Sequence, residues 1–216
     1  MAGVTLAGGL KVVLSGNGQG AIASALRTVY ALAGASFVDD AADATSLVAA
    51  FTSDVALCTT GRLRLKDIRH VYPLEIDDTY RSNYLHPRCF CERHLRTMEI
   101  AGTGTVVVLG SNAALGGQAD AEDYAAMKAA LRLYCHLRGR TSRARGVRLI
   151  HVTLGAVASP FWEKATHGRP ANWPDLAPDP RKALTPREVA EAIAAVVALP
   201  AHVTVKDLHL VSTDYQ

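Results

Sequence analysis

The sequence predicts a doubly wound α/β domain, in which helices cover both faces of a mostly parallel sheet. Short β-branched runs, such as residues 105–110, alternate with longer amphipathic segments along most of the chain. A glycine-rich turn at 15–20 joins the first of these runs to a helical pattern. The hydrophobic fraction of 49% over 216 residues is enough for one substantial core. We therefore expect residues 1–216 to form a single three-layer domain.

The first predicted strand, residues 10–14, leads through this turn into an amphipathic helix. Glycine lets a backbone come close to a diphosphate, and a helix N-terminus offers free N–H groups and the positive end of the helix dipole. Read as Gly18-x-Gly20-x-x-Ala23, the turn fits the general dinucleotide pattern with alanine in the last place. The alternative is a glycine-rich turn that binds nothing.

A second strand is predicted over residues 34–40, and it ends in Asp39 and Asp40. An acid about twenty residues beyond the glycines can hydrogen-bond the 2′-hydroxyl of the adenosine ribose. Because an acid repels a 2′-phosphate, this pair favours NAD(H) over NADP(H). The alternative is that the two acids cap a helix over residues 41–51, a role that would not exclude ribose contact.

The next segments are a third strand, a connection and a long helix. The strand is predicted over residues 54–61 and ends in the sequence C-T-T-G. Residues 62–73 are basic and irregular, which is typical of an exposed connection, and a helix is expected from 76 to about 98. That helix carries His86, Cys89, Cys91 and His94. At about 100° per residue these side chains are spread around the helix and cannot converge on one ion, so no zinc site is predicted.

The chemistry is concentrated between residues 105 and 128. The predicted strand over 105–110 ends at Ser111, and the following helix places Tyr124 and Lys128 one turn apart on one face. A free tyrosine has a pKa of about 10, and a nearby cation lowers that pKa toward the working range. The three side chains are therefore predicted to form a proton-transfer set. The alternative is a surface Tyr–Lys pair on an ordinary helix.

Ser111 followed by Tyr124-x-x-x-Lys128 resembles the S…Y-x-x-x-K motif of the short-chain dehydrogenase/reductase family. The resemblance covers nearly the whole chain and is strongest over residues 105–211. It implies a Rossmann-type fold with Tyr124 as the acid–base, Lys128 on the nicotinamide ribose and Ser111 on the substrate oxygen. It also implies that Asn83 kinks its helix and holds a water in a proton relay to Lys128.

The resemblance extends to the cofactor contacts, with departures. The family's G-x-x-x-G-x-G motif has Ile22 in place of its third glycine, and C-T-T-G stands where the family has N-N-A-G. Residues 154–159 are similar to P-G-x-V-x-T, with Leu154 for the proline and Ser159 for the threonine that binds the carboxamide. The implied cofactor contacts are Gly16, Asn17, Gly18, Gln19, Gly20, Ile22, Asp39, Asp40, Thr59, Thr60, Gly61, Tyr124, Lys128, Gly155, Val157 and Ser159.

The N-terminal half is shorter than in the family by one strand–helix unit. Either the outer strand has been lost, or residues 38–40 stand in for the family's third strand and the second has been lost. The family also packs its long helix, here 76–98, against a neighbouring subunit. The resemblance therefore implies a homodimer or homotetramer, with buried cysteines and interface histidines on this helix.

The C-terminal third follows the same alternation. A strand is predicted over residues 147–154, and a stretch rich in proline and tryptophan, 160–184, is predicted to be an irregular lid over the substrate. Thr185-Pro-Arg-Glu188 is a capping box with proline at the first helical position, and it opens a helix that runs to about 199. A last strand is predicted over 203–211.

Composition narrows the functional classes. The net charge of +3 gives no support for nucleic-acid binding. The arginines between 132 and 148 are predicted to be a solvated helix end and loop, with an anionic partner as the alternative. No stretch is long enough to cross a bilayer, and the N-terminus lacks the layout of a signal peptide. Four cysteines do not form a disulfide framework at this size, so a reduced, cytoplasmic protein is expected.

Together these features predict an NAD(P)-dependent oxidoreductase that interconverts a carbonyl and an alcohol of a small-molecule substrate. The departures on the cofactor side leave two alternatives open. One is a non-redox acid–base step, such as an isomerisation or a dehydration. The other is a non-catalytic subunit that assembles with a partner.

Overall fold

The computed structural model describes residues 6, 8–15, 20–40, 52–65, 72–116, 120–166 and 178–214. Six strands form one sheet in the order β2-β1-β3-β4-β5-β6, and every neighbouring pair is parallel. The strands are β1 (Lys11–Ser15), β2 (Ser36–Asp40), β3 (Val55–Cys58), β4 (Gly104–Leu109), β5 (Val147–Leu154) and β6 (Asp207–Leu210). The helices are α1 (Ala21–Leu32), α2 (Pro73–Tyr80), the π-helix η2 (Arg81–Leu85), α3 (His86–Ala101), α4 (Ala113–Gly116), α5 (Glu122–Arg143), α6 (Phe161–Thr166) and α7 (Pro186–Val197).

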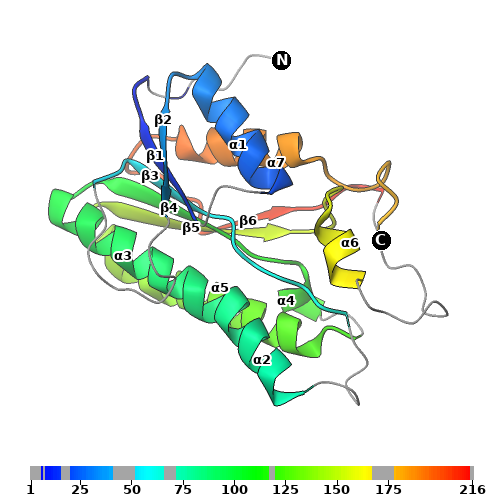
Figure 1. Ribbon diagram of the computed structural model, residues 1–216. Helices are drawn as coiled ribbons and strands as arrows, with labels where there is room; N and C mark the ends of the chain where they lie inside the picture. Colours follow the sequence, from blue (N-terminus) through cyan, green and yellow to red (C-terminus); the bar gives the residue numbers. More distant parts are fainter. Residues whose placement is uncertain are drawn as a thin grey trace.

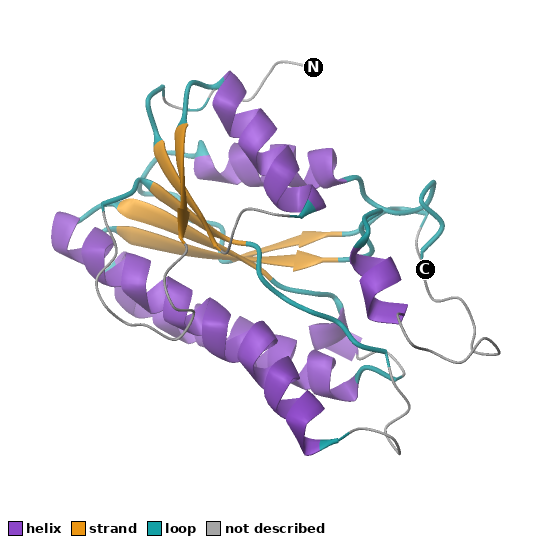
Figure 2. Cartoon of the chain, viewed as in Figure 1, coloured by secondary structure: helices purple, strands orange, loops and turns teal. Residues whose placement is uncertain are grey.

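Helices cover both faces of the sheet (Figures 1 and 2). The helices α1 and α7 lie against each other on one face, and α3 and α5 lie on the other. This arrangement confirms the predicted doubly wound α/β fold with three layers. In such a sheet, ligands bind beyond the carboxyl ends of the strands, where the strand order reverses. Here the reversal falls between β1 and β3. From β1 the chain continues to β2 at one edge of the sheet, and from β3 it continues in the other direction to β6.

The pairing of β2 shows on which side the sheet is shortened. Val13 of β1 is in register with Val38 of β2 on one side and with Ala56 of β3 on the other. The predicted second strand therefore lies directly beside β1, and the described residues contain no strand beyond it. The sheet is thus one strand shorter than the family's on this side, and the loss of either strand would leave the remaining one beside β1. An edge strand is the one that a sheet can lose without breaking the other pairings.

The inner strands are buried on both faces, as parallel strands between two helical layers must be. Leu14 and Ile150 face the layer of α1 and α7, where they pack with Leu26 and Ile193. On the other face, residues of β3, β4 and β5 pack against α3 and α5 through side chains that include Leu95. These two clusters fix the strands in register, and so they fix the loops that leave the carboxyl ends.

The last helix has the predicted ends. The Thr185 hydroxyl accepts a hydrogen bond from the Glu188 N–H at 3.2 Å, and the Glu188 carboxylate accepts one from the Thr185 N–H at 2.7 Å, which confirms the capping box. At the other end of α7, Arg148 donates to the carbonyls of Val197 and Leu199 at 2.9 and 3.0 Å. Arg148 is thus engaged inside the molecule, and the prediction of a solvated arginine is wrong at this position.

Another arginine of the run also has internal partners. Arg138 of α5 donates to Glu92 of α3 at 3.2 Å and to Glu99 of α3 at 2.7 Å. Its side chain is only 17% exposed, so it bridges the two helices rather than lying in solvent. The cluster of arginines in the sequence therefore reflects helix-to-helix and helix-to-strand contacts at these positions.

The predicted helix over 76–98 is divided into α2, η2 and α3. Cys89 and Cys91 are buried, as expected from the resemblance. His94 is also buried, at 1% exposure, and its Nε2 lies 3.3 Å from Asp40 of β2, so it does not face a neighbouring subunit as that resemblance implied. Within the described ranges, no three histidine, cysteine or acidic side chains are grouped as ligands for a metal ion.

Other boundaries differ by a few residues. The first strand begins and ends one residue later than predicted, and the last is limited to Asp207–Leu210. The predicted lid is not wholly irregular, because it begins with the short helix α6. Residues 167–177 of this stretch and the helix expected over 41–51 lie outside the described residues. No helix in the part of the chain described above has the length and apolar content needed to cross a bilayer.

Candidate active site

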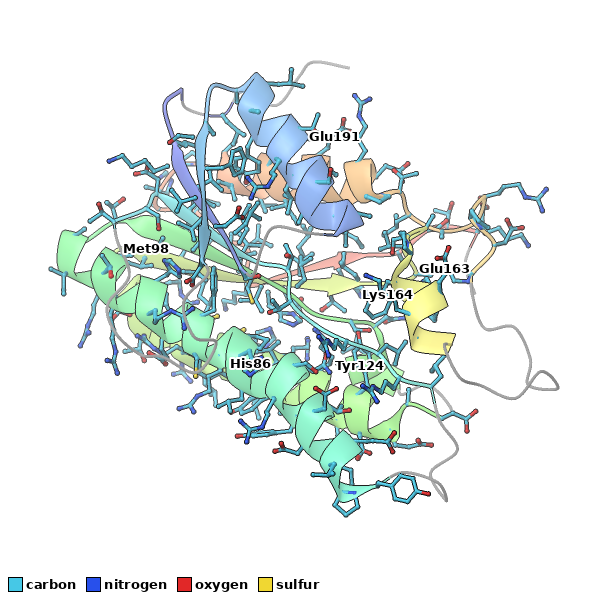
Figure 3. The ribbon with its side chains drawn as sticks, in the orientation of Figure 1. His86, Met98, Tyr124, Glu163, Lys164 and Glu191 are labelled. Carbon is cyan, nitrogen blue, oxygen red and sulfur yellow. The ribbon has the colours of Figure 1, made fainter. Side chains whose placement is uncertain are left out.

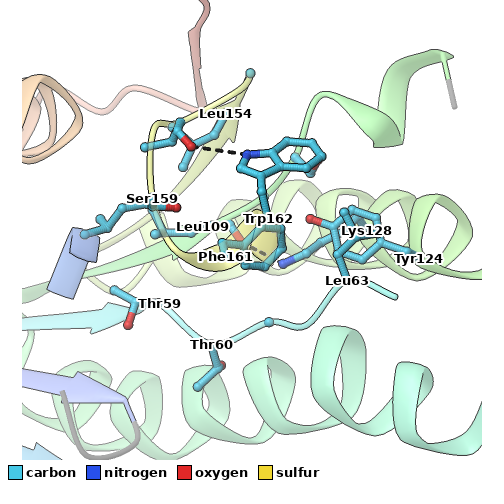
Figure 4. Close-up of a pocket in the computed structure, with 16 residues that line it drawn as sticks. Thr59, Thr60, Leu63, Leu109, Tyr124, Lys128, Leu154, Ser159, Phe161 and Trp162 are labelled. Atoms are coloured by element: carbon cyan, nitrogen blue, oxygen red, sulfur yellow. Dashed lines mark hydrogen bonds between the residues drawn. The ribbon is translucent and has the colours of Figure 1, made fainter. Parts of the chain in front are cut away.

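A cavity of about 140 Å³ opens at the carboxyl ends of the central strands (Figure 4). Its walls come from the segments that follow β3, β4 and β5, and from the first turns of α1 and α5. Many residues selected from the sequence meet there. They are Ile22, Thr59, Thr60, Gly61, Ser111, Tyr124, Lys128, Gly155, Val157 and Ser159.

Tyr124 lies in the first turn of α5 and is 7% exposed. Burial raises the pKa of this phenol to about 12, and a hydrogen bond with Ser111 opposes that shift. Ser111 also accepts a hydrogen bond from the backbone N–H of Ala113 at 3.2 Å, which holds its hydroxyl at the end of β4. The hydroxyl and the phenol are thus brought together as the sequence predicted.

Lys128 lies one turn further along α5 and is 3% exposed. Its ammonium donates to the carbonyl of Leu109 at 3.1 Å, and its nitrogen is 5.8 Å from the centre of the Tyr124 ring. The predicted lowering of the Tyr124 pKa is therefore not found, because the cation is directed to a backbone carbonyl and burial dominates. Burial likewise lowers the pKa of Lys128 to about 8.

Asn83 is fully buried in η2, the π-helix that interrupts the long helix at the predicted kink. Its side-chain amide donates to the carbonyls of Arg62 and Thr79 at 2.8 and 3.0 Å, and its oxygen accepts the Arg62 N–H at 3.0 Å. A Cβ on Gly61 would lie 3.1 Å from this oxygen and 2.9 Å from the Lys128 nitrogen. Asn83 and Lys128 therefore border the same glycine, which has no room for a side chain.

The two acids at the end of β2 point away from each other. Asp40 is buried under α3, where it pairs with Arg93 at 2.5 Å and His94 at 3.3 Å. Asp39 is exposed and pairs with Arg27 of α1. Neither acid is among the described residues that line the cavity. The sequence did not reveal these partners, because Arg93 and His94 are far away along the chain. The turn residues Gly16, Asn17, Gly18 and Gln19 lie outside the described residues.

A small apolar cluster borders the cavity, and the sequence analysis did not predict that Leu63 and Leu65 belong to it. Leu63 and Leu65 are buried against Tyr124, Phe161 and Trp162, in a stretch that was expected to be exposed. The alternation of leucine with arginine and lysine was the available signal. The Trp162 indole donates to the Val157 carbonyl at 3.2 Å, and the Leu65 N–H donates to the carbonyl of Ala165 in α6 at 3.2 Å.

The buried side chain of His151 packs against Gly110, which lines the cavity. The ring of His151 in β5 packs against Gly110, so closely that a Cβ on that glycine would lie 2.2 Å from its Nε2. Gly110 separates Leu109, which holds Lys128, from Ser111. The other ring nitrogen of His151 lies 3.1 Å from a carboxylate oxygen of Asp207, to which Thr153 also donates at 2.8 Å. Asp207 thus fixes the imidazole.

This histidine predicts a loss of stability in mild acid. Burial lowers the His151 pKa to about 4, with Lys128 and His136 acting in the same direction and Asp207 against it. Between about pH 6.5 and pH 4 the unfolded chain binds a proton that the folded chain does not, so the free energy of unfolding falls as the pH falls. The loss reaches up to about 3 kcal/mol.

Urea unfolding at a series of pH values measures this effect. In the variant His151→Asn the amide can still donate to Asp207 but has no titration in this range. We expect the dependence on pH between 6.5 and 4 to become shallower in that variant. An equal slope in both proteins would show that other groups cause the acid sensitivity.

A second cavity, of about 450 Å³, continues from the first. The two share Ile22, Thr59, Gly61, Leu63, Ser159 and Phe161, and the second reaches Gly20 at the N-terminus of α1. None of the described residues lining either cavity is acidic, whereas Arg62, Arg64 and Lys164 line the second. A long ligand with a reactive ring at one end and a diphosphate further along fits these surroundings, and a nicotinamide dinucleotide has this chemistry.

Comparisons with known proteins agree with this geometry. The family model described as short chain dehydrogenase matches residues 5–170. No curated protein sequence matches the chain. Among solved structures, the closed form of a serine dehydrogenase complexed with NADP+ is similar, with a TM-score of 0.78, 17% identity and coverage of 96% of both chains. An identity this low shows a similarity of fold alone.

Two other solved structures have similar scores. A ribose-5-phosphate isomerase from Brucella melitensis has a TM-score of 0.76 and 19% identity, over 96% of this chain and 92% of that chain. An alcohol dehydrogenase from the archaeon Thermococcus sibiricus, complexed with 5-hydroxy-NADP, has a TM-score of 0.74 and 18% identity, over 96% and 98%.

Proposed function

The chain belongs to the short-chain dehydrogenase family, and we propose that it is an NAD(P)-dependent oxidoreductase that interconverts a carbonyl and an alcohol on a small molecule. The observation that carries this proposal is the convergence of Ser111, Tyr124 and Lys128 in one cavity that continues to the N-terminus of α1. The three side chains lie at one end of the two connected cavities, and the N-terminus of α1, which can bind an anion, lies at the other.

In the direction of reduction, Tyr124 donates its phenolic proton to the carbonyl oxygen. Its raised pKa of about 12 keeps the phenol protonated at neutral pH, which suits a proton donor. Ser111, a hydrogen-bond partner of Tyr124, holds the same substrate oxygen. When bound, the nicotinamide dinucleotide supplies or accepts the hydride. In the direction of oxidation Tyr124 takes the proton back.

Lys128 returns the proton to Tyr124 in this proposal, and Asn83 would hold a water of the relay. The Lys128 pKa of about 8 is close to neutral, so the amine can both hold and release a proton under working conditions. Asn83 borders the same glycine, Gly61, and its buried amide keeps the Arg62 backbone in place beside it. Lys128 would also hold the nicotinamide ribose.

The segments after β3 and β5 would hold the rest of the dinucleotide. Thr59 donates its N–H to Ser15 at 2.8 Å, which ties the end of β3 to the end of β1. Ser159 lines both cavities, and its hydroxyl would bind the carboxamide of the nicotinamide (Figure 4). A preference for NAD(H) stays a prediction and now depends on Asp39 alone, because Asp40 is buried with Arg93 whereas Asp39, although paired with Arg27, is exposed.

A second candidate function is a non-redox acid–base step, such as an isomerisation or a dehydration. It is favoured by Ile22, whose side chain lines both cavities where the family's motif has a glycine. A non-catalytic subunit is a weaker third candidate, because the complete Ser–Tyr–Lys set would have no purpose in it.

Assembly as a homodimer or homotetramer in the cytoplasm completes the proposal. Leu133 and Leu137 of α5 are 59% and 56% exposed, which supports a subunit contact on this helix. All four cysteines are free and buried, as expected for a reduced compartment. Light scattering on the purified protein measures the assembly.

A panel of ketones and aldehydes, each supplied with NADH or NADPH, tests the proposed reaction. Loss of nicotinamide absorbance with an equal amount of alcohol formed would support the oxidoreductase. Conversion of a substrate with no change in the nicotinamide would instead favour the non-redox candidate.

A further inference from the structure

The second cavity is bordered by cations that the family motifs do not include. Arg62 and Arg64 follow the C-T-T-G segment after β3, and Lys164 projects from α6 (Figure 3). The N-terminus of α1, at Gly20 and Ala21, lines the same cavity. Cationic side chains and a helix N-terminus all favour a negatively charged ligand, and no acid among the described lining residues opposes them.

The backbone of Arg62 is held by hydrogen bonds, whereas the side chains of both arginines are largely exposed. Asn83 forms two hydrogen bonds with the Arg62 backbone, at 2.8 and 3.0 Å, so this residue is fixed relative to the reactive end of the site. The Arg62 and Arg64 side chains are 68% and 54% exposed. Asp78 lies 3.8 Å from the first and 3.4 Å from the second, and Glu75 lies 3.8 Å from the second.

These distances are longer than those of a well-formed charged hydrogen bond. By contrast, Asp77, the neighbour of Asp78 on α2, pairs with Arg81 at 2.6 Å. Arg62 and Arg64 can therefore change partners at low cost, because exposed ion pairs of this kind stabilise the fold very little.

The reactive residues determine which part of a dinucleotide reaches the arginines. Ser111, Tyr124 and Lys128 line only the first cavity, so the nicotinamide end belongs there. The adenosine end must extend through the second cavity past α1. The diphosphate lies between these two ends, in the part of the space that Arg62 and Arg64 share with the N-terminus of α1.

We propose that Arg62 and Arg64 bind the diphosphate of the nicotinamide dinucleotide in the cavity that they share with the N-terminus of α1, exchanging Asp78 and Glu75 for phosphate oxygens. This inference rests on the proposed function. It also explains how a chain with Ile22 in the glycine motif can retain affinity for the cofactor, since two charge-assisted contacts are added at the phosphates.

Fluorescence titration with NADH tests the proposal in the double variant Arg62→Gln, Arg64→Gln. We expect the Kd for NADH to rise at least about tenfold, because charge-assisted hydrogen bonds are lost. The Kd for ADP-ribose, measured by competition, should rise by the same factor, since this probe has the diphosphate but no nicotinamide. Added salt should weaken NADH binding less in the variant than in the wild type.

Two controls separate phosphate binding from structural effects. Arg187→Gln removes a more exposed arginine on α7, which pairs with Glu191; neither residue lines either cavity, and this variant should leave the Kd unchanged. Asp78→Asn removes the carboxylate that competes for both arginines, so it should leave the Kd unchanged or lower it. If the arginines act only by anchoring α2, Asp78→Asn should weaken binding as much as the double variant does.

The outcomes also distinguish this inference from the proposed function. Wild-type binding with an unchanged Kd in the double variant would overturn the inference and leave the oxidoreductase intact; an anionic group of the substrate would then be the partner of the arginines. No binding of NADH or NADPH to the wild type would overturn both.

Discussion

Replacing Tyr124 by phenylalanine is expected to lower kcat by at least about a thousandfold, since the variant loses the group that gives the proton to the carbonyl oxygen. The ring itself is buried and packs against Leu63, so phenylalanine keeps its contacts and the fold. The Kd for NADH should stay within about twofold of the wild type, because only a hydroxyl is removed. Steady-state rates and a fluorescence titration measure the two quantities.

Tyr134→Phe is the matched control for this experiment. Tyr134 lies on the same helix, and its hydroxyl donates to Glu92 at 2.8 Å, away from the cavity. We expect its rate to remain close to that of the wild type. A Tyr124→Phe variant that retained wild-type rates would refute the assignment of this residue as the acid–base.

Replacing Gly110 by alanine is expected to lower the free energy of unfolding by about 3 kcal/mol. The added Cβ would lie 2.2 and 2.3 Å from two ring atoms of His151 and 3.2 Å from the Val152 carbonyl oxygen. The imidazole cannot turn aside, because Asp207 holds its other side and the ring is fully buried. Urea unfolding followed by circular dichroism measures the loss.

Gly116→Ala provides the comparison, because a Cβ at Gly116 would meet nothing within 4 Å. That variant should unfold at nearly the wild-type urea concentration. If Gly110→Ala were as stable as the wild type, the close packing of His151 against the end of β4 would be ruled out as a determinant of the site.

The fold and the grouping of Ser111, Tyr124 and Lys128 were predictable because their signals are local. The strand patterns, the capping box at Thr185 and the spacing of Tyr124 and Lys128 all lie within a few residues. The kink at Asn83 was also predicted, through the resemblance of the motifs, and it appears as η2. Local patterns of this kind survive folding because they agree with the tertiary structure.

The predictions that failed depended on partners far away in the sequence. Asp40 looked like a ribose ligand at the end of a strand, but α3 supplies Arg93 and His94 to it. The pKa of Tyr124 follows burial, and residues far along the chain contribute to that burial, Leu63 and Leu65 after β3 and Phe161 and Trp162 in α6. The place of residues 36–40 beside β1 depends on the pairing of two strands, which no stretch of sequence displays.

The central claim is that this site binds a nicotinamide dinucleotide, and a titration of the wild-type protein with NADH and with NADPH tests it most directly. Nicotinamide fluorescence should change with a Kd in the micromolar range for at least one of the two, and the preferred nucleotide tests the role of Asp39. If neither nucleotide binds at millimolar concentration, the claim is contradicted, and Tyr124 and Lys128 serve a reaction without hydride transfer or none.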